Sequence, residues 1–125
     1  LIRRMALDLN LGIEVIGCPT VREKDGLALS SRNVNLQGDE RKRALSLSRG
    51  LRKATDLFAA GEKEASILIL AVSQELEMAE AKIDYIAVVD PDTLKPLERV
   101  DISARIAVAA RIGATRLIDN IPLEL

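Results

Sequence analysis

The sequence predicts an α+β fold in which two helices pack on a small antiparallel sheet of about three strands, preceded by a helix and a strand from an α/β domain. Two observations support this prediction. Apolar residues recur every three or four positions through residues 39–80, and short β-branched runs replace that period after residue 82. The 125 residues, 48% of them hydrophobic, suffice for one domain with a buried core and a piece of another.

The first 21 residues are interpreted as the end of a separate domain. Apolar residues in the range 1–10 have helical spacing, and Gly12 is expected to terminate this helix. Ile13–Gly17 is a largely β-branched run, which predicts a buried strand of a parallel sheet whose other strands are missing. Helical spacing starts at Leu1, which is neither methionine nor a capping residue, so we expect the later part of a longer enzyme.

Two consecutive helices are predicted in the middle of the chain. Asp39 is expected to cap the first, with Glu40 beside its positive N-terminal end, and Gly61 is expected to end it. The second helix covers residues 62–80 and pairs with the first. Their apolar positions are Ala44, Leu47, Leu51, Ala54 and Phe58 in the first helix, and Ala65, Leu68, Val72, Leu76 and Ala79 in the second.

Three strands are predicted after the helices. Residues 83–89 are rich in Ile, Val and Tyr, and the following Asp90–Thr93 is a turn with proline at its second position. Residues 104–110 and 115–121 lie on either side of Gly113, which predicts a hairpin. Helices followed by strands favour an antiparallel sheet with one face covered by the helices.

Composition argues against several functions. A formal net charge of −1 and an aromatic content of 2% are atypical of nucleic-acid binding. With no histidine and one cysteine, we expect no metal site built by the chain itself. That cysteine, Cys18, lies in an apolar run and is expected to be a buried thiol. Cysteine usage and the lack of a signal-peptide pattern or long apolar stretch predict a cytoplasmic protein without a membrane partner.

The segment Val21–Asn33 has the makeup of a loop that binds phosphate groups. Gly26 lets it turn, and Ser30, Ser31 and Arg32 follow in succession. Hydroxyl and amide groups donate hydrogen bonds to phosphate oxygens, and arginine adds a permanent charge with bidentate geometry. By composition alone, a solvated surface loop is the better explanation of the Ser-Ser-Arg run.

The same segment, Val21–Asn33, closely resembles a loop of the pantoate–β-alanine ligase (pantothenate synthetase) family. Residues 1–9 and 18–20 resemble the end of that family's first domain. Residues 85–97 and 115–120 resemble its closing sheet. The resemblance therefore covers essentially the whole chain and corresponds to the C-terminal part of the family.

The resemblance implies a two-step reaction. Pantoate attacks the α-phosphate of ATP to give pantoyl adenylate and pyrophosphate, and β-alanine then displaces AMP. It also implies that Leu29–Arg32 corresponds to the mobile KMSKS loop of related adenylate-forming enzymes, with Arg32 at the second lysine and Leu29 where many members have methionine. The implied ATP-binding residues are Val21, through its backbone, and Leu29, Ser30, Ser31 and Arg32. Arg32 is the implied catalytic residue, and Mg²⁺ is expected to arrive with ATP.

The resemblance further implies that other functional parts of the family lie upstream of Leu1: a histidine motif, pantoate-binding glutamines and a phosphate-binding lysine. Residues 1–21 would then be the incomplete end of a Rossmann-like nucleotide-binding domain, and residues 22–125 the lid that closes over ATP. We expect no ligase activity from this chain alone. Pantoate and β-alanine should bind only with the missing domain, and residues 1–18 should promote self-association.

Two alternatives remain open at this point. The chain could be the lid of another adenylate-forming transferase that uses a different acid, or a free-standing interaction module without catalysis. Upstream residues that select the acid would distinguish the first alternative from the pantoate ligase. Nucleotide binding by the chain would distinguish the lid from the interaction module.

Other charged residues are interpreted as structural. Arg22–Asp25 alternates in charge, which favours pairs that shape the loop over catalytic groups. Asp119 and Asn120 are expected to cap the hairpin or hold the hinge. The loose basic stripe on the first long helix is interpreted as a solvated face, and it consists of Arg41, Arg49, Arg52 and Lys53.

Overall fold

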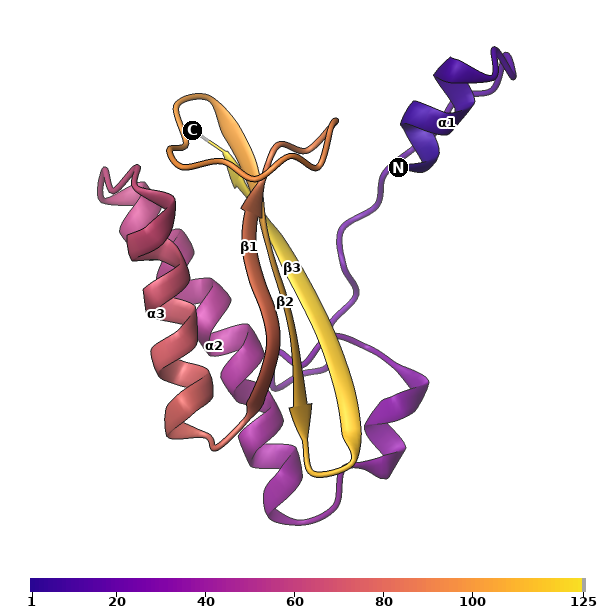
Figure 1. Cartoon of the computed structure of the whole chain (residues 1–125). Coiled ribbons are helices and arrows are strands. Elements are labelled where there is room, and N and C mark those ends of the chain that lie inside the picture. Colours follow the sequence, from indigo (N-terminus) through magenta and orange to yellow (C-terminus); the bar gives the residue numbers. More distant parts are fainter. Residues whose placement is uncertain (125) are drawn as a thin grey trace.

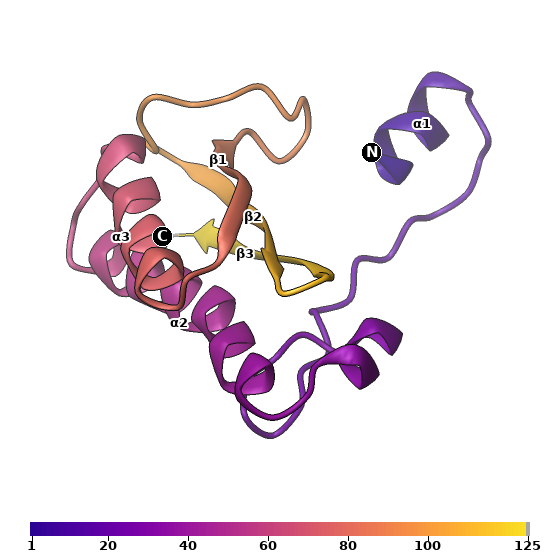
Figure 2. The same ribbon diagram turned by 60° about the horizontal axis from the view of Figure 1, so that its bottom comes forward.

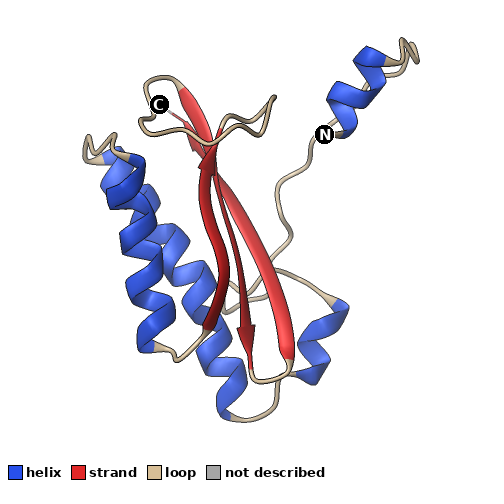
Figure 3. Ribbon diagram, in the orientation of Figure 1, coloured by secondary structure: helices blue, strands red, loops and turns tan. Residues whose placement is uncertain are grey.

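The computed structural model describes residues 1–124 and confirms the predicted α+β class. Figures 1 and 3 show two long helices against one face of a three-stranded sheet, with a short helix standing apart at the end of an extended arm. The elements are, in order, α1 (Ile2–Asp8), the 3-10 helix η1 (Ser31–Asn35), α2 (Asp39–Ala59), α3 (Ala65–Met78), β1 (Lys82–Val89), β2 (Ser103–Ile112) and β3 (Thr115–Glu124).

The two long helices bury the apolar stripes that the sequence predicted. Every predicted stripe residue of α2 is at most 2% exposed, and so is every one within α3, while Ala79, just after α3, is 8% exposed. The predicted cap at Asp39 is wrong by one position, because Gly38 is the N-cap and Asp39 is the first helical residue. Gly38 has a φ of +52°, a conformation that favours glycine, so the chain enters the helix through the glycine. Asp39 and Glu40 both lie in the first turn.

The sheet is antiparallel with strand order β1-β2-β3. The predicted hairpin between residues 110 and 116 is confirmed: Ile112 pairs with Thr115, and Gly113 in the turn has a φ of +56°. Strand β1 has a register shift between Ile83 and Tyr85. The side of the sheet that faces the helices completes the core, and its fully buried large residues include Val88, Ile106, Val108, Ile112 and Leu123.

The arm between α1 and the body differs from expectation. Ile13–Gly17, predicted as a buried strand, is not a strand, and Ile13 and Ile16 are 60% and 76% exposed. A strand needs a neighbouring backbone to complete its hydrogen bonds, and within residues 1–124 this run pairs with none. Cys18 is exposed for the same reason, so the prediction of a buried thiol is wrong. Figure 2 shows the arm leading away from the rest of the chain.

The described part of the chain, residues 1–124, has no helix with both the length and the apolar character needed to cross a membrane.

Candidate functional site

The segment that precedes η1 is folded into a small hairpin. Glu23 N donates to Leu27 O at 2.8 Å, and Leu29 N donates to Val21 O at 2.9 Å. The predicted turn is confirmed at the tip, where Gly26 has a φ of +95°. The hairpin therefore delivers Ser30 to the start of η1 in a defined orientation.

Ser30 and Arg32 lie at the junction of the hairpin and η1. Ser30 is the N-cap of η1, and its Oγ accepts the backbone N–H of Arg32 at 3.2 Å. This bond uses a lone pair of Oγ, so the hydroxyl hydrogen of Ser30 stays free to donate. The exposed Arg32 guanidinium has no ion-pair partner within residues 1–124.

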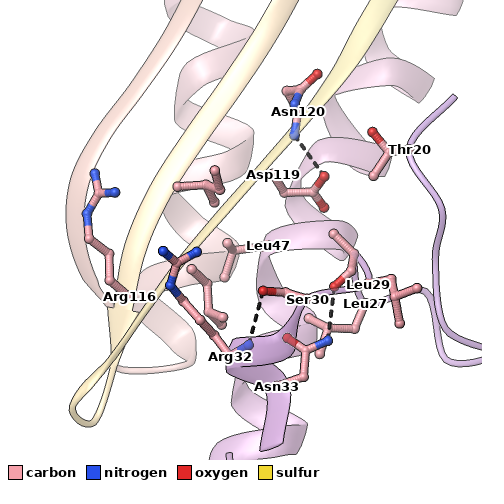
Figure 4. Close-up of a pocket in the computed structure, with 13 residues that line it drawn as sticks. Thr20, Leu27, Leu29, Ser30, Arg32, Asn33, Leu47, Arg116, Asp119 and Asn120 are labelled. Atoms are coloured by element: carbon pink, nitrogen blue, oxygen red, sulfur yellow. Dashed lines mark hydrogen bonds between the residues drawn. The ribbon is translucent and has the colours of Figure 1, made fainter. Parts of the chain in front are cut away.

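A pocket of about 230 Å³ lies between this loop and strand β3, as Figure 4 shows. Its apolar lining comes from Leu27, Ala28, Leu29, Leu47, Leu117 and Ile118. Its polar lining comes from Thr20, Ser30, Arg32, Asn33, Arg116, Asp119 and Asn120. The pocket thus combines hydrogen-bond donors and two guanidinium groups with an apolar wall, which suits a ligand that is partly apolar and partly anionic.

The structure brings three of the sequence-predicted site residues together in this pocket: Leu29, Ser30 and Arg32. Val21 and Ser31 do not line it. Val21 is 65% exposed, and its carbonyl oxygen accepts the Leu29 N–H with one of its two lone pairs.

Arg22 ties the hairpin to the sheet. Its guanidinium makes a two-pronged ion pair with Asp119 on β3, at 2.7 Å and 2.9 Å, and the Asp119 side chain is only 2% exposed. Asn120 N also donates to Asp119 Oδ1 at 2.7 Å. Asp119 thus fixes the loop to the strand on the other side of the pocket.

Arg41 of α2 holds the tip of the hairpin. Its guanidinium donates to Glu23 at 2.7 Å and to Asp25 at 2.6 Å. Asn33, which is buried, donates from Nδ2 to Glu23 Oε1 at 2.6 Å and to Ala28 O at 3.1 Å. Arg22, Glu23 and Asp25 thus pair with residues outside the segment Arg22–Asp25, and Lys24 makes no ion pair within residues 1–124. Arg41 holds the loop and is not part of a solvated face. Both loop carboxylates are already engaged, so they do not form a free metal site.

The loop should loosen in acid. Hydrogen bonds from Arg41 hold the pKa values of Glu23 and Asp25 below their ordinary values of 4.5 and 3.8. A lowered folded-state pKa means that the stabilisation is complete above the ordinary value and is lost as pH falls through the folded value. We therefore expect amide exchange in residues 22–30 to accelerate only when the pH falls below these ordinary values. Carboxyl titration followed by NMR checks this, with Arg41→Gln as the control that returns both groups toward ordinary values. Titration of wild-type Glu23 and Asp25 at ordinary values would contradict the assignment.

Sequence reasoning missed several residues of the site. A single asparagine after a polar run, such as Asn33, carries no distinctive sequence signal. Arg116 borders the same pocket as Arg32 only because β3 packs against η1, which local sequence does not indicate. The predicted hairpin around Gly113 was the one available sign that Arg116 would lie near the end of the sheet.

Comparison with known proteins places the chain in a family. The family model of pantoate-beta-alanine ligase matches residues 1–122. The pantothenate synthetase of Moorella thermoacetica is 51% identical over 125 residues, which cover 99% of this chain and 44% of that enzyme. The pantothenate synthetase of Thermotoga neapolitana is 49% identical over 120 residues, which cover 95% of this chain and 43% of that enzyme.

Solved structures of the same family also match this chain. The crystal structure of pantothenate synthetase from Thermus thermophilus matches with a TM-score of 0.90 and 42% identity, over 99% of this chain and 45% of that one. A pantoate-beta-alanine ligase from Francisella tularensis, complexed with beta-gamma ATP and beta-alanine, matches with a TM-score of 0.60 and 30% identity, over 96% of this chain and 37% of that one. The chain thus spans less than half the length of these relatives. It belongs to the pantoate–β-alanine ligase family.

Proposed function

We propose that this chain forms the ATP lid of an ATP-dependent ligase that condenses pantoate with β-alanine to pantothenate through a pantoyl adenylate, releasing AMP and pyrophosphate. The observation that carries the proposal is the pocket in which Leu29, Ser30 and the guanidinium of Arg32, unpaired within residues 1–124, meet. Family membership supports pantoate over a different acid. The relative from Francisella tularensis, whose structure contains a form of ATP and β-alanine, supports the same substrates.

Different residues of the loop contact different parts of ATP. Ser30 and Ser31 donate hydrogen bonds to phosphate oxygens, and the Val21 backbone meets the adenine. Leu29 supplies an apolar anchor. Arg32 is the catalytic residue, because its fixed charge stabilises the negative charge that develops on the departing pyrophosphate.

Closure of the lid protects the intermediate. In this proposal residues 1–21 belong to the nucleotide-binding domain and residues 22–125 move as the lid. Because Arg22 and Arg41 fasten the loop to β3 and α2, the loop moves together with the lid body. Closing excludes water from the mixed anhydride and brings Arg32 to the pyrophosphate.

Other partners follow from the same proposal. Mg²⁺ arrives with ATP and is held mostly by phosphate oxygens. Pantoate and β-alanine bind with the help of the nucleotide-binding domain. Self-association through residues 1–18 rests on exposed apolar side chains there, among them Ile2, Leu7 and Leu9, which are 65%, 71% and 63% exposed. A cytoplasmic location stays a prediction from cysteine usage.

A chimera tests the proposed function. The chain is fused behind the preceding portion of the Moorella thermoacetica enzyme, to which it is 51% identical. The fusion should form pantothenate, AMP and pyrophosphate in equal amounts, and the chain alone should form none. Arg32→Gln in the fusion should lower kcat about a hundredfold.

A matched control separates the Arg32 effect from a general loss of charge. Arg49→Gln removes a half-exposed guanidinium of α2 that pairs with Glu75 and lines no part of the loop pocket, so it should leave kcat unchanged. A folded fusion that makes no pantothenate would contradict the ligase proposal. If the fusion is active and Arg32→Gln has the kcat of the wild-type fusion, Arg32 has no role in the catalytic step.

A further inference from the structure

The end of the sheet next to the β2–β3 turn carries a row of cations. Lys82 on β1 lies opposite Arg111 on β2, and Arg111 lies opposite Arg116 on β3. Residues directly opposite in an antiparallel sheet share one face, and like charges placed in this way are destabilising. One carboxylate, Asp84, serves both arginines, at 2.6 Å from Arg116 and 3.7 Å from Arg111. The row therefore keeps an excess of positive charge.

Of these three cations, only Arg116 lines the site. It borders the loop pocket together with Arg32 and Ser30. It also lines a neighbouring pocket of about 420 Å³ that has Arg32, Asn35, Glu40, Ala114 and Thr115 as its other walls. Figure 4 shows Arg32 and Arg116 at the same end of the loop pocket, the first from η1 and the second from β3. Glu40 is the only carboxylate among the residues that line the second pocket, and Arg116 also pairs with Asp84, which lies outside that lining.

The Arg116 guanidinium is hydrogen-bonded through Nε, and its terminal nitrogens are free. Its Nε donates to Asp84 Oδ2 at 2.6 Å, and its terminal amino groups have no hydrogen-bond partner within residues 1–124. The side chain is 43% exposed, so these groups are open to a ligand. An arginine oriented through Nε can present both terminal nitrogens to an anion without further ordering.

We propose that Arg116 is a second anion-binding residue, which acts with Arg32 as a two-arginine clamp on a linear polyphosphate. The proposal rests on the proposed function, since the loop pocket is the phosphate site there. Arg32 is supplied by η1 and Arg116 by the sheet. Two guanidinium groups that border the same pocket can engage different phosphoryl groups of the same chain.

Calorimetric titration of the 125-residue chain with inorganic triphosphate tests the clamp. Arg116→Gln should raise Kd about tenfold or more, since a charge-assisted bidentate contact is lost. Arg111→Gln is the matched control, because Arg111 pairs with the same Asp84 and lines neither pocket. It should change Kd less than about twofold. Arg116→Lys keeps the positive charge but lacks the planar guanidinium that binds through two nitrogens. It should recover part of the affinity that Arg116→Gln loses.

The outcomes separate this proposal from the one on which it rests. If Arg32→Gln weakens binding and Arg116→Gln does not, the clamp is overturned and the loop proposal survives. If Arg116→Gln alone weakens binding, Arg116 is an anion site and the role of Arg32 fails. Equal losses in Arg116→Gln and Arg111→Gln, or no binding by the wild-type chain at millimolar triphosphate, overturn the clamp. Circular dichroism checks that each variant is folded. If Arg116→Gln is unfolded, the Kd of Arg116→Lys for triphosphate tests the clamp instead.

Discussion

Replacement of Arg22 by glutamine should lower the free energy of unfolding by about 3 kcal/mol, because it leaves the buried Asp119 carboxylate without its counter-charge. The two side chains meet through two bonds of 2.7 Å and 2.9 Å. Asp119 is 2% exposed and so has almost no access to water that could replace the guanidinium. Loss of this pair also detaches the loop from β3, so amides in residues 22–30 should exchange faster than those of the helices.

Urea denaturation and hydrogen exchange measure the two parts of the Arg22 effect. Lys24→Gln is the control, since Lys24 lies in the same loop, is exposed and makes no ion pair within residues 1–124. It should change stability by less than about 0.5 kcal/mol. An Arg22→Gln variant with wild-type stability and wild-type exchange in the loop would show that the ion pair does not anchor it.

Replacement of Gly50 by valine should destabilise the fold by about 3 kcal/mol, because α2 and α3 cross closely at this residue. A Cβ at Gly50 would lie 3.1 Å from both Cα and Cγ1 of Val72, and 3.3 Å from its carbonyl oxygen. Two of these atoms belong to the backbone of α3, so the helices must separate to admit the side chain. Gly50 has ordinary helical geometry, and a better helix former would gain only about 1 kcal/mol there.

Thermal and urea denaturation give the size of the Gly50 effect. Ala59→Val is the matched control, because Ala59 is an exposed residue of the same helix and the change also introduces a β-branched side chain. It should cost less than about 0.5 kcal/mol. Equal losses in the two variants would contradict a steric limit at the helix crossing.

The sequence predicted the elements that depend on local pattern. The helical stripes of α2 and α3, the three strands and the hairpin at Gly113 all follow from periodicity and turn residues within short windows. The prediction failed at Ile13–Gly17 and Cys18, where apolar character alone suggested burial. An apolar run becomes a buried strand only when a neighbouring strand and a covering surface are present, and within residues 1–124 neither is available to this run.

The site was predicted only where its residues are close in sequence. The Ser30–Arg32 run stood out locally, whereas its supports come from elsewhere. Arg22 and Asp119 are 97 positions apart, and Arg41 reaches Glu23 from the next helix. Such contacts depend on strand register and on the packing of the loop against the sheet, which no short window of sequence encodes.

An NMR titration of the chain with magnesium-ATP tests most directly the claim that this loop binds nucleotide phosphates. The amides of Val21, Gly26, Ser30, Ser31 and Arg32 report on the loop, and those of α3 serve as an internal reference on the far side of the core. The account predicts saturable shifts confined to the loop and its pocket, and their loss in Arg32→Gln. No shifts at millimolar nucleotide, or shifts that persist unchanged in Arg32→Gln, would contradict it.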